Sequence, residues 1–569
     1  MRHSHRVFAL FLLQVGVWCG LTSCTGALHK KWADKEVFGI LRRKAAKVPN
    51  SGTDLLSITP PGKLNVDKLS KSNKDVDFLG KSAHLEKGAR VVKLSDALDY
   101  AVTRNRSYLT EKESLYLTAL DLTSARWVHG PLLVGTGSGT HQTQNVEQTV
   151  NNFVKDSTLT NTGAFSLSTL ARTGARLAVD LTTDFTRLLT GNLRDVSNSK
   201  LAVSLSQPLL RGAGVMAASE PLTQGERTTL YAIRTFTQFR KSFTVDVTSA
   251  FYETLRSRDA ARNAFMAYDS FEEVVEREKA MGEENKRTPS QVGLMEQAVL
   301  TYHRRWINAV KSYEEALDRL KIQLGLPVND KFILDQDELY SMKLVDPPGS
   351  LEGALDTAMS TRLELWNKRD ELEDAERRVR IAKQNLLPGL SVTGFGNVVG
   401  DKDADGSNLD GHRRDYGVKL DLDLNLDQLP RRNDLRAAQI AEQAARRALD
   451  LEEENVRQQI RLAWRNLDVA RRLYELAEVT VELCVRRLEQ EEAFTEENRG
   501  DARNLIDAQQ DLIDARDQRM AALVAHTVAR LQLWRDMGIL TIQKDGRWVD
   551  VLKNEPPKGA PAPGNPKKP

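Results

Sequence analysis

The chain has 569 residues, of which 28% are charged and 40% are hydrophobic, and its formal net charge is +3. This near-neutral balance gives no reason to expect nucleic-acid binding, which relies on an excess of basic side chains. The C-terminal half is dominated by Ala, Leu, Glu, Arg and Gln. Such a composition favours long helices that pack through small residues.

The N-terminus is predicted to be a lipoprotein signal peptide over 1–23. A basic start precedes an apolar stretch over 7–19, which has about the length of a signal h-region and is too short to span a bilayer. The sequence Leu-Thr-Ser-Cys at 21–24 then resembles a bacterial lipobox, in which Cys24 is acylated and anchors the chain to a membrane. The alternative is ordinary cleavage that leaves Cys24 as a free thiol. We find no other run that predicts a transmembrane helix.

Two further segments differ in composition from the body. Residues 24–90 are rich in lysine and interrupted by proline and glycine, which indicates an anchor and linker that packs in part against the body. Residues 546–569 combine proline with lysine, which indicates a disordered tail.

The body contains an internal repeat, with copies over 91–330 and 345–540. Residues 94–105 and 351–362 share the pattern L-x-x-A-L-x-x-A, which opens a helix in each copy. In the second copy this helix is predicted over about 351–386. Each copy is predicted to contain a helix, a strand pair, a very long helix, a turn and a returning helix. The first copy is longer because of a Thr/Asn/Gly-rich stretch at 136–174. This stretch has no strong period, so we expect a long surface loop there.

Alternating apolar and polar residues predict the strands. At 416–426, Val418 and every second residue after it are apolar, while the residues between them are polar. Strands with one apolar and one polar face are typical of membrane barrels. The predicted strands are 175–186, 200–209, 390–398 and 416–426, with a weaker candidate at 132–140 that is either a partner or an extension of the first. The charged residues expected to face a water-filled lumen are Asp180, Asp184, Lys419, Asp421 and Asp423.

Very long helices are predicted over about 215–281 and 432–498, and each would span roughly 100 Å at 1.5 Å per residue. Apolar residues in the second helix are spaced alternately by three and four, which indicates a sustained coiled-coil seam. The members of this seam are Val456, Ile460, Ala463, Leu467, Ala470, Tyr474, Ala477, Val481, Cys484 and Leu488. A returning helix follows each long helix, the first of them starting at Pro289.

Two strand pairs supply four strands, which cannot close a barrel, and an open sheet edge is not tolerated in lipid. The chain is therefore expected to oligomerise. Three copies would give a twelve-stranded barrel that continues into a helical tube. We expect a mainly α protein with a transmembrane β part, and a trimer of this design is a conduit.

Three motifs resemble those of TolC-like outer-membrane efflux proteins of the lipoprotein subgroup, and the resemblance covers about 91–540. The sequence Leu-Ser-Gln-Pro-Leu-Leu-Arg-Gly at 205–212 resembles the family's exit from strand to helix, and Leu387-Pro388 precedes a strand as in the family. The third motif is Gly500 followed by Asn-Leu-Ile-Asp-Ala at 504–508, which resembles the family's helical tip.

The resemblance implies a homotrimer in the outer membrane of a Gram-negative-type bacterium, with its helices in the periplasm. It also implies docking onto a periplasmic adaptor and an inner-membrane transporter, so that drugs, metals or proteins pass outward. Asp507 and Asn504 would then lie at the periplasmic constriction, where three copies of Asp507 form an acidic ring. The turns at Gly282 and Gly500 would contact the adaptor.

No constellation of residues indicates an enzyme, a cofactor site or a metal site, because the histidines are scattered without ligand spacing. The alternative to a channel is a coiled-coil periplasmic lipoprotein acting as a scaffold or adaptor. An adaptor is expected to have one helical hairpin flanked by compact β-domains. This chain instead has two repeats, each with a strand pair that leads into a very long helix, and this arrangement favours the channel.

Overall fold

The computed structural model describes residues 26–52, 70–71, 76–149, 152–189, 195–284, 288–345, 349–400, 409–424, 426–497 and 501–549. The signal peptide, Cys24, Gly500 and nearly all of the predicted tail lie outside these residues. The chain divides into two compact units, each assembled from three stretches of sequence. Unit 1 comprises 1–44, 116–232 and 367–449, and unit 2 comprises 45–115, 233–366 and 450–569.

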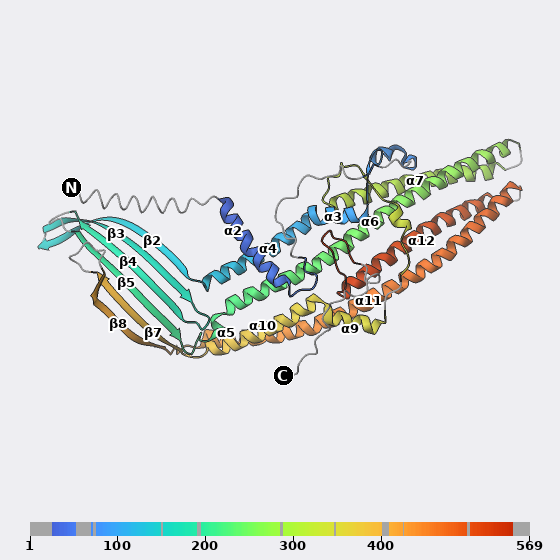
Figure 1. The fold of residues 1–569 in the computed structure, drawn as a ribbon. Coiled ribbons are helices and arrows are strands. Elements are labelled where there is room, and N and C mark those ends of the chain that lie inside the picture. The colour runs from blue at the N-terminus through green and yellow to red at the C-terminus, as the bar shows by residue number, and fades with distance from the viewer. Residues whose placement is uncertain are drawn as a thin grey trace. The chain divides into compact units, whose positions relative to one another are not determined.

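Unit 1 contains one curved sheet of six strands in the order β2-β3-β4-β5-β7-β8 (Figure 1). All neighbouring strands in it are antiparallel. The strands are β2 (Leu132–Thr149), β3 (Asn152–Leu170), β4 (Arg176–Leu188), β5 (Asp195–Pro208), β7 (Gly389–Gly400) and β8 (Leu409–Asp423). The strands predicted at 175–186, 200–209, 390–398 and 416–426 correspond to β4, β5, β7 and β8.

The expectation of a surface loop at 136–174 is wrong, because most of this stretch forms the hairpin β2–β3. Its strands place polar residues on both faces, as in the opposed pair Thr140–Thr160 on one face and the pair Thr143–Ser157 on the other. A strand that is polar on both faces has no alternating pattern, although threonine itself favours strands. The weak candidate at 132–140 therefore belongs to β2, which pairs with β3 and not with β4.

The predicted strand at 416–426 also ends earlier than expected. Asp423 is opposite Gly389 in the last pair of the β7–β8 ladder. Pro388 precedes Gly389 and has no N–H to continue the ladder. Leu424 and Leu426 thus lie beyond the strand and are exposed, and Asn425 lies outside the described residues.

Long helices dominate the rest of the chain, as predicted. Both very long helices are present, as α6 (Glu220–Glu283) and α11 (Leu429–Glu496), and they are followed by α7 (Pro289–Gln323) and α12 (Ala502–Asp536). The remaining helices are α2 (Gly26–Ala45), α3 (Leu94–Arg104), α4 (Arg106–Val128), α5 (Val215–Ala218), α8 (Asp337–Tyr340), α9 (Leu351–Thr361) and α10 (Leu363–Asn385), with a 3-10 helix at Asp77–Leu85. A small parallel pair joins β1 (Arg90–Val92) to β6 (Phe332–Leu334). None of the helices described combines the length and the apolar character needed to cross a bilayer.

Two helices predicted to be continuous are broken. The helix expected over 351–386 divides into α9 and α10 at Arg362, whose ψ of 124° is extended. The helix expected from 215 is interrupted at Ser219, between α5 and α6. Helix α7 begins as predicted, with Thr288 as N-cap and Pro289 at its first turn.

Two glycine turns in unit 2 make similar close contacts. Gly325 and Gly538 have φ values of 71° and 77°. A Cβ on Gly325 would lie 2.5 Å from the carbonyl oxygen of Arg104, at the end of α3, and a Cβ on Gly538 would lie 2.7 Å from Oγ1 of Thr361, at the end of α9. Only glycine fits a left-handed backbone at so short a distance.

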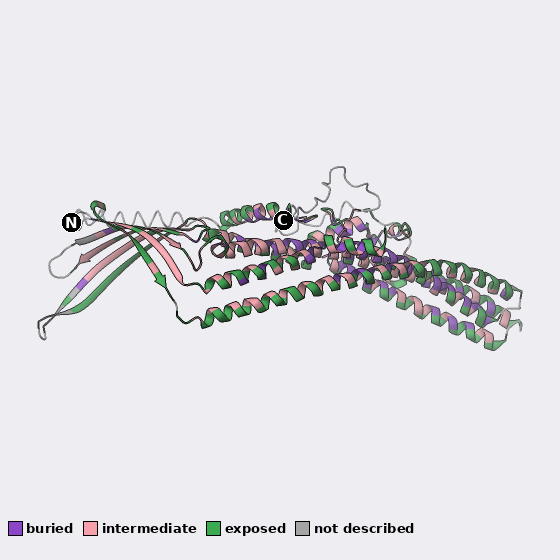
Figure 2. Ribbon diagram, turned by 90° about the horizontal axis from the view of Figure 1, so that it is seen from below, coloured by how far each residue is buried: buried purple, intermediate pink, exposed green. Residues whose placement is uncertain are grey.

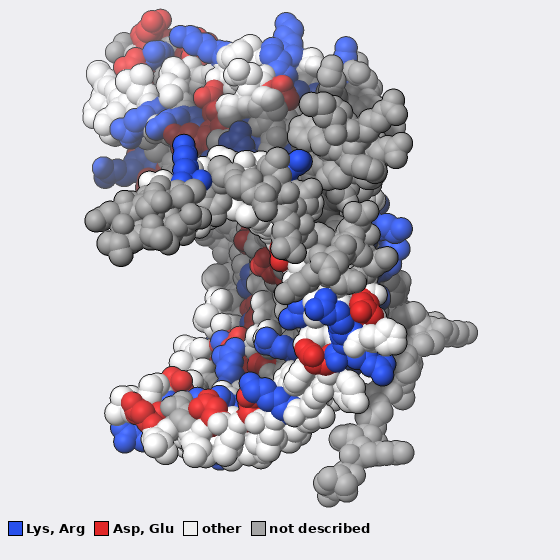
Figure 3. Space-filling view, turned by 90° about the vertical axis from the view of Figure 1, so that its left-hand side faces the viewer, with Lys and Arg blue, Asp and Glu red and all other residues white. Residues whose placement is uncertain are grey.

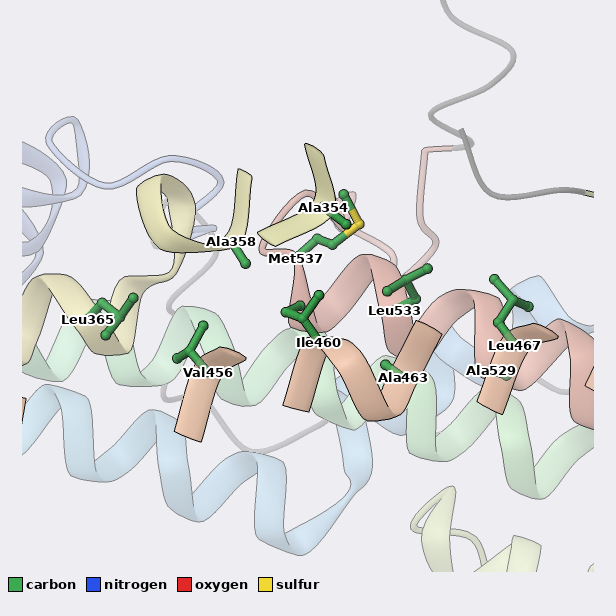
Figure 4. Close-up of a cluster of buried hydrophobic side chains, with 10 residues drawn as sticks. All are labelled: Ala354, Ala358, Leu365, Val456, Ile460, Ala463, Leu467, Ala529, Leu533 and Met537. Carbon is green, nitrogen blue, oxygen red and sulfur yellow. The ribbon is translucent and has the colours of Figure 1, made fainter. Parts of the chain in front are cut away.

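The core of unit 2 is formed by small, aliphatic and aromatic side chains between helices. The predicted seam of α11 is buried at Val456, Ile460, Ala463 and Leu467, which pack against α9, α10 and α12 (Figure 4). A second cluster joins α6 and α7 to α12. Buried residues concentrate in these helices, whereas the strands of the sheet are mostly intermediate or exposed (Figure 2). The sheet therefore does not supply the core.

Candidate functional site

The sheet of unit 1 has one apolar face that extends across all six strands. Opposed residues in antiparallel strands share a face. One such row crosses the whole sheet and ends in apolar residues at both edges, in the order Leu133, Leu167, Val179, Val203, Gly396 and Tyr416. Adjacent rows add further aliphatic side chains on the same face, among them Leu181, Leu201, Leu205, Leu390, Val418, Leu420 and Leu422.

This apolar face is not covered by other described parts of the chain. Tyr416 and Val418 on β8 are 82% and 77% exposed, and Leu133 on β2 is 75% exposed. Leu420 and Leu205 also exceed half exposure. Soluble monomers rarely expose a contiguous apolar surface of this extent, which marks an interaction with lipid or with another protein.

The opposite face is polar and carries all five charged residues predicted for the lumen. Asp180 lies in a row that leads through Ala202 and Asn397 to Asp415. Asp184 is four residues from Asp180 on β4 and therefore lies on the same face. On β8, every second residue shares the face of Asp415, and these residues include Lys419, Asp421 and Asp423. Near the strand ends that lead to the helices, the sheet thus separates apolar from charged side chains, as the alternation predicted. Farther along the strands, Arg187 and Arg414 lie on the same face as Val179 and Tyr416.

Contacts on the polar face tie neighbouring strands together. The Ser166 hydroxyl donates to Oδ1 of Asp180 at 2.5 Å, which links β3 to β4. Lys419 Nζ lies 2.6 Å from Oδ1 of Asp421 within β8. These groups are exposed or half-buried, so the ion pair contributes little to stability. Both side chains of the pair are exposed to solvent.

The exit from strand to helix at 205–212 is fixed by contacts that the sequence did not reveal. Arg211 Nη2 lies 2.6 Å from Oδ2 of Asp423, which joins the end of β5 to the end of β8. The Gln384 side chain donates to the carbonyl oxygens of Leu210 and Ala213 at 3.1 and 2.6 Å. Asp423, predicted only as a lumen residue, therefore also orients this junction.

A buried charge network lies beside the junction, between the start of α6 and α10. The Asp374 side chain is 4% exposed. It accepts hydrogen bonds from the Tyr231 hydroxyl at 2.7 Å and from Arg377 Nη1 at 2.9 Å, and it pairs with Arg227. Arg377 also pairs with Glu220 at 2.6 Å. Burial and the hydrogen bond to Asp374 raise the pKa of Tyr231, so its hydroxyl remains a donor.

At the tip of α12, Asn504 and Asp507 are exposed, while Ala502, Leu505 and Ala508 are buried. Residues three apart in a helix share a face. The two predicted constriction residues therefore point away from the helix packing on one side of α12. Their place in a constriction stays a prediction.

The corresponding position in α7 differs. Glu296 matches Asp507 when Gly-Leu-Met-Glu-Gln at 293–297 is aligned with Asn-Leu-Ile-Asp-Ala at 504–508, and it pairs with Lys279 at 2.9 Å. No ion pair involving Asp507 occurs among the described residues. The carboxylate at the tip of α12 is therefore more available to an ion than the one on α7.

Gly282 lies in the last turn of α6 and not in the chain reversal itself. A Cβ at Gly282 would lie 3.1 Å from Cγ2 of Val292. Glycine here allows α6 and α7 to approach closely. Contact of this region with an adaptor remains a prediction, and Gly500 lies outside the described residues.

Charges of both signs are mixed on the face of the molecule shown in Figure 3. No extended surface of one sign is seen there, in keeping with the net charge of +3. Within the part of the chain that the structure describes, no group of His, Cys, Asp and Glu residues could hold a metal ion.

A sheet with one apolar and one polar face, whose strands lead into paired long helices, is the fold of TolC-like outer-membrane channels. No protein-family model matches the chain, and a search of curated proteins gives no match. Solved structures do match.

A membrane protein from Pseudomonas aeruginosa is 15% identical, with a TM-score of 0.59 over 78% of this chain and 92% of that chain. The CmeC outer-membrane channel of Campylobacter jejuni is 14% identical, with a TM-score of 0.56 over 85% of this chain and 96% of that chain. The MtrE outer-membrane channel of Neisseria gonorrhoeae, solved in its open state, is 14% identical, with a TM-score of 0.57 over 80% of this chain and 90% of that chain. These identities are low, and the likeness shows the fold.

Proposed function

We propose that this chain is the outer-membrane channel component of a tripartite efflux or type I secretion system. It would conduct substrates passively from a periplasmic adaptor and inner-membrane transporter to the exterior, and it would not be an enzyme. The observation that carries the proposal is the exposed apolar face across all six strands, backed by a polar face that carries the five charged residues predicted for the lumen. Lipid outside and water inside account for both faces at once.

A membrane location requires more than one copy of the chain. The edges of the sheet carry unpaired backbone groups that cannot be left in lipid, because each would cost several kcal/mol. Closure by other copies removes the edges. We propose a homotrimer, as the resemblance to TolC-like proteins implies.

Helix α11 supports association of copies through a second apolar stripe. Leu462, Val469, Leu476 and Leu483 recur every seven residues, and each is more than half exposed. A repeat of seven is the signature of a coiled-coil seam. The first seam of α11 is buried within the chain, so this second stripe fits a helix from a neighbouring copy, as in a helical tube.

The finer assignments follow from this proposal. Asp507 and Asn504 would line the periplasmic constriction, and the turns near Gly282 and Gly500 would contact the adaptor. Acylated Cys24 would anchor the chain in the outer membrane after removal of 1–23. The equivalent contacts of Gly325 and Gly538 support two repeated halves at 91–330 and 345–540.

The decisive experiment is purification from membranes in detergent, followed by sizing and single-channel recording in planar bilayers. We expect a trimer that forms stable conducting pores. A soluble monomer without conductance would contradict the proposal and would favour the alternative, a coiled-coil periplasmic scaffold or adaptor.

A further inference from the structure

The sheet of this chain has two strands more than the four predicted from the repeat. The additional hairpin β2–β3 is joined to β4 by a continuous ladder of thirteen pairs, from Thr158–Leu188 to Leu170–Arg176. The apolar face continues onto it through Leu133, Phe165 and Leu167. The hairpin is thus an integral part of the sheet and has the same two faces near the strand ends.

The two edge strands, β2 and β8, have opposite directions. Each of the five neighbouring pairs from β2 to β8 is antiparallel. Because the direction alternates over an even number of strands, the two edge strands run in opposite directions. The β8 strand of one copy can pair with the β2 strand of the next in the same antiparallel manner as every other pair in the sheet.

The β2 edge has little of the usual protection against pairing, and the register irregularity in its ladder with β3 lies near its far end, between Glu147 and Thr149. It is 18 residues long and contains neither lysine nor proline. Natural edge strands are usually short, or carry lysine, proline or bulges that block another strand. A long unprotected edge is suited to a permanent partner.

The side chains of the two edges are complementary on the apolar face. The β2 strand presents Gly135, Gly137 and Gly139 in alternate positions on the face that carries Leu133. The β8 strand presents bulky exposed groups on this face, including Tyr416 and Val418. Large side chains on one strand commonly cover glycines on the adjacent strand of a barrel.

From these observations we propose that β8 of one copy pairs with β2 of the next, so that three sheets of six strands close a single barrel of eighteen strands. This inference rests on the trimer of the proposed function and replaces the twelve-stranded barrel expected from the sequence. Barrel diameter grows roughly in proportion to strand number, so the pore would be about 1.5 times as wide as with twelve strands. Cargo at the outer exit could be correspondingly larger.

The competing arrangement keeps twelve strands in the barrel. In it, β2 and β3 would leave the sheet and β8 would pair with β4 of the next copy. The two arrangements place different outward-facing residues beside Val418, so disulfide cross-linking distinguishes them. Disulfides form only where the two Cα atoms lie within about 7 Å.

The test uses the full-length protein in outer-membrane vesicles, in a Cys484→Ser background. Val418→Cys is combined with Cys at Leu133, Gly135 or Gly137 in one series, and with Cys at Leu177, Val179 or Leu181 in a second series. A positive control pairs Gly394→Cys with Val418→Cys, because these residues are opposite each other within one chain. Single-cysteine Val418→Cys is the negative control.

We expect dimer and trimer bands for at least one pair of the β2 series and none for the β4 series. Cross-links in the β4 series alone would overturn the eighteen-stranded barrel while leaving the trimeric channel intact. A protein that stays monomeric in detergent would overturn the proposed function as well. As an independent readout, electron cryo-microscopy of the trimer should show eighteen strands, and twelve would contradict the inference.

Discussion

The two long helices α6 and α11 differ in what covers them within unit 2. Side chains of α6 are buried by distant parts of the same chain: Arg258 pairs with Glu86, and Lys241 donates to the carbonyl oxygen of Gly538. In α11 one seam is buried, while Leu476 and Leu483 on another side remain exposed. The difference teaches that similar helix lengths and apolar content do not define similar roles. One helix is completed by its own chain, and the other is suited to a second copy.

The largest effect is expected from charges on the exposed stripe of α11. The variant combines Leu476→Glu with Leu483→Glu. If the stripe is buried between copies, the loss of each leucine contact would weaken association by about 1.5–3 kcal/mol. We expect loss of the trimer in size-exclusion chromatography with light scattering, with helix content unchanged by circular dichroism. The control is Arg471→Glu, which adds the same charge on a side of α11 turned away from Leu476, at a side chain that is 42% exposed. A double variant that remains trimeric would show that the stripe is not an interface.

The next effect is expected where α6 is covered by the N-terminal segment. The side chains of Arg258 and Glu86 are 3% and 0% exposed, and Nε and Nη2 of Arg258 each lie 2.8 Å from a Glu86 oxygen. The Tyr313 hydroxyl donates to the same carboxylate at 2.6 Å. Glu86→Gln leaves a buried charge without its partner and should lower the free energy of unfolding by about 3–5 kcal/mol.

Denaturant unfolding followed by circular dichroism measures this loss. Glu253→Gln is the matched control, because it removes an exposed partner of Arg256 on the same helix and should cost less than about 1 kcal/mol. Equal effects of the two substitutions would contradict the distinction between a buried and an exposed pair.

The pH dependence of stability tests the covering of α6 at Lys241. Burial lowers the pKa of Lys241 to about 8, and Arg240 and Arg362 act in the same direction, against Glu364. Between pH 8 and the ordinary value of 10.5 the unfolded chain binds more protons than the folded chain. Stability from this residue therefore rises with pH across this window, by roughly 3 kcal/mol in total.

Unfolding free energies at pH 8 and pH 10 should show this rise in the wild type and a smaller rise in Lys241→Met. Lys311→Met, at a side chain 72% exposed, should keep the wild-type profile. A Lys241→Met protein with an unchanged profile would show that Lys241 titrates normally.

The smallest effect is expected at the helical tips, where Asp507 and Glu296 differ in their ion pairing. Asp507→Ala removes three charges from the ring of a trimer and should reduce the cation-to-anion permeability ratio by at least about threefold, because each charge about 6 Å from a passing ion contributes about 0.7 kcal/mol in water before salt screening. Reversal potentials under a KCl gradient in planar bilayers measure this ratio. Glu296→Ala is the control, since Lys279 already neutralises Glu296. Unchanged selectivity in Asp507→Ala would exclude the acidic ring.

The sequence by itself determined the features that depend on local periodicity. The alternation at Val418–Leu422 and the spacing from Val456 to Leu467 predicted the two-faced strands and the buried seam, because side-chain direction follows directly from backbone geometry. The start of α7 at Pro289 was also predictable, because proline is favoured at the first position of a helix. All five charged residues predicted for the lumen lie on the polar face, and the alternation along each strand was enough to find them.

Only the tertiary structure decided which distant segments meet. The hairpin β2–β3 was missed because polar residues on both faces remove the alternation that marks a membrane strand. The pairs Arg211–Asp423 and Glu86–Arg258 join residues 212 and 172 positions apart, and no local pattern records such partners. The number of strands in the sheet, and with it the expected width of the pore, therefore follows from long-range backbone pairing and not from sequence period.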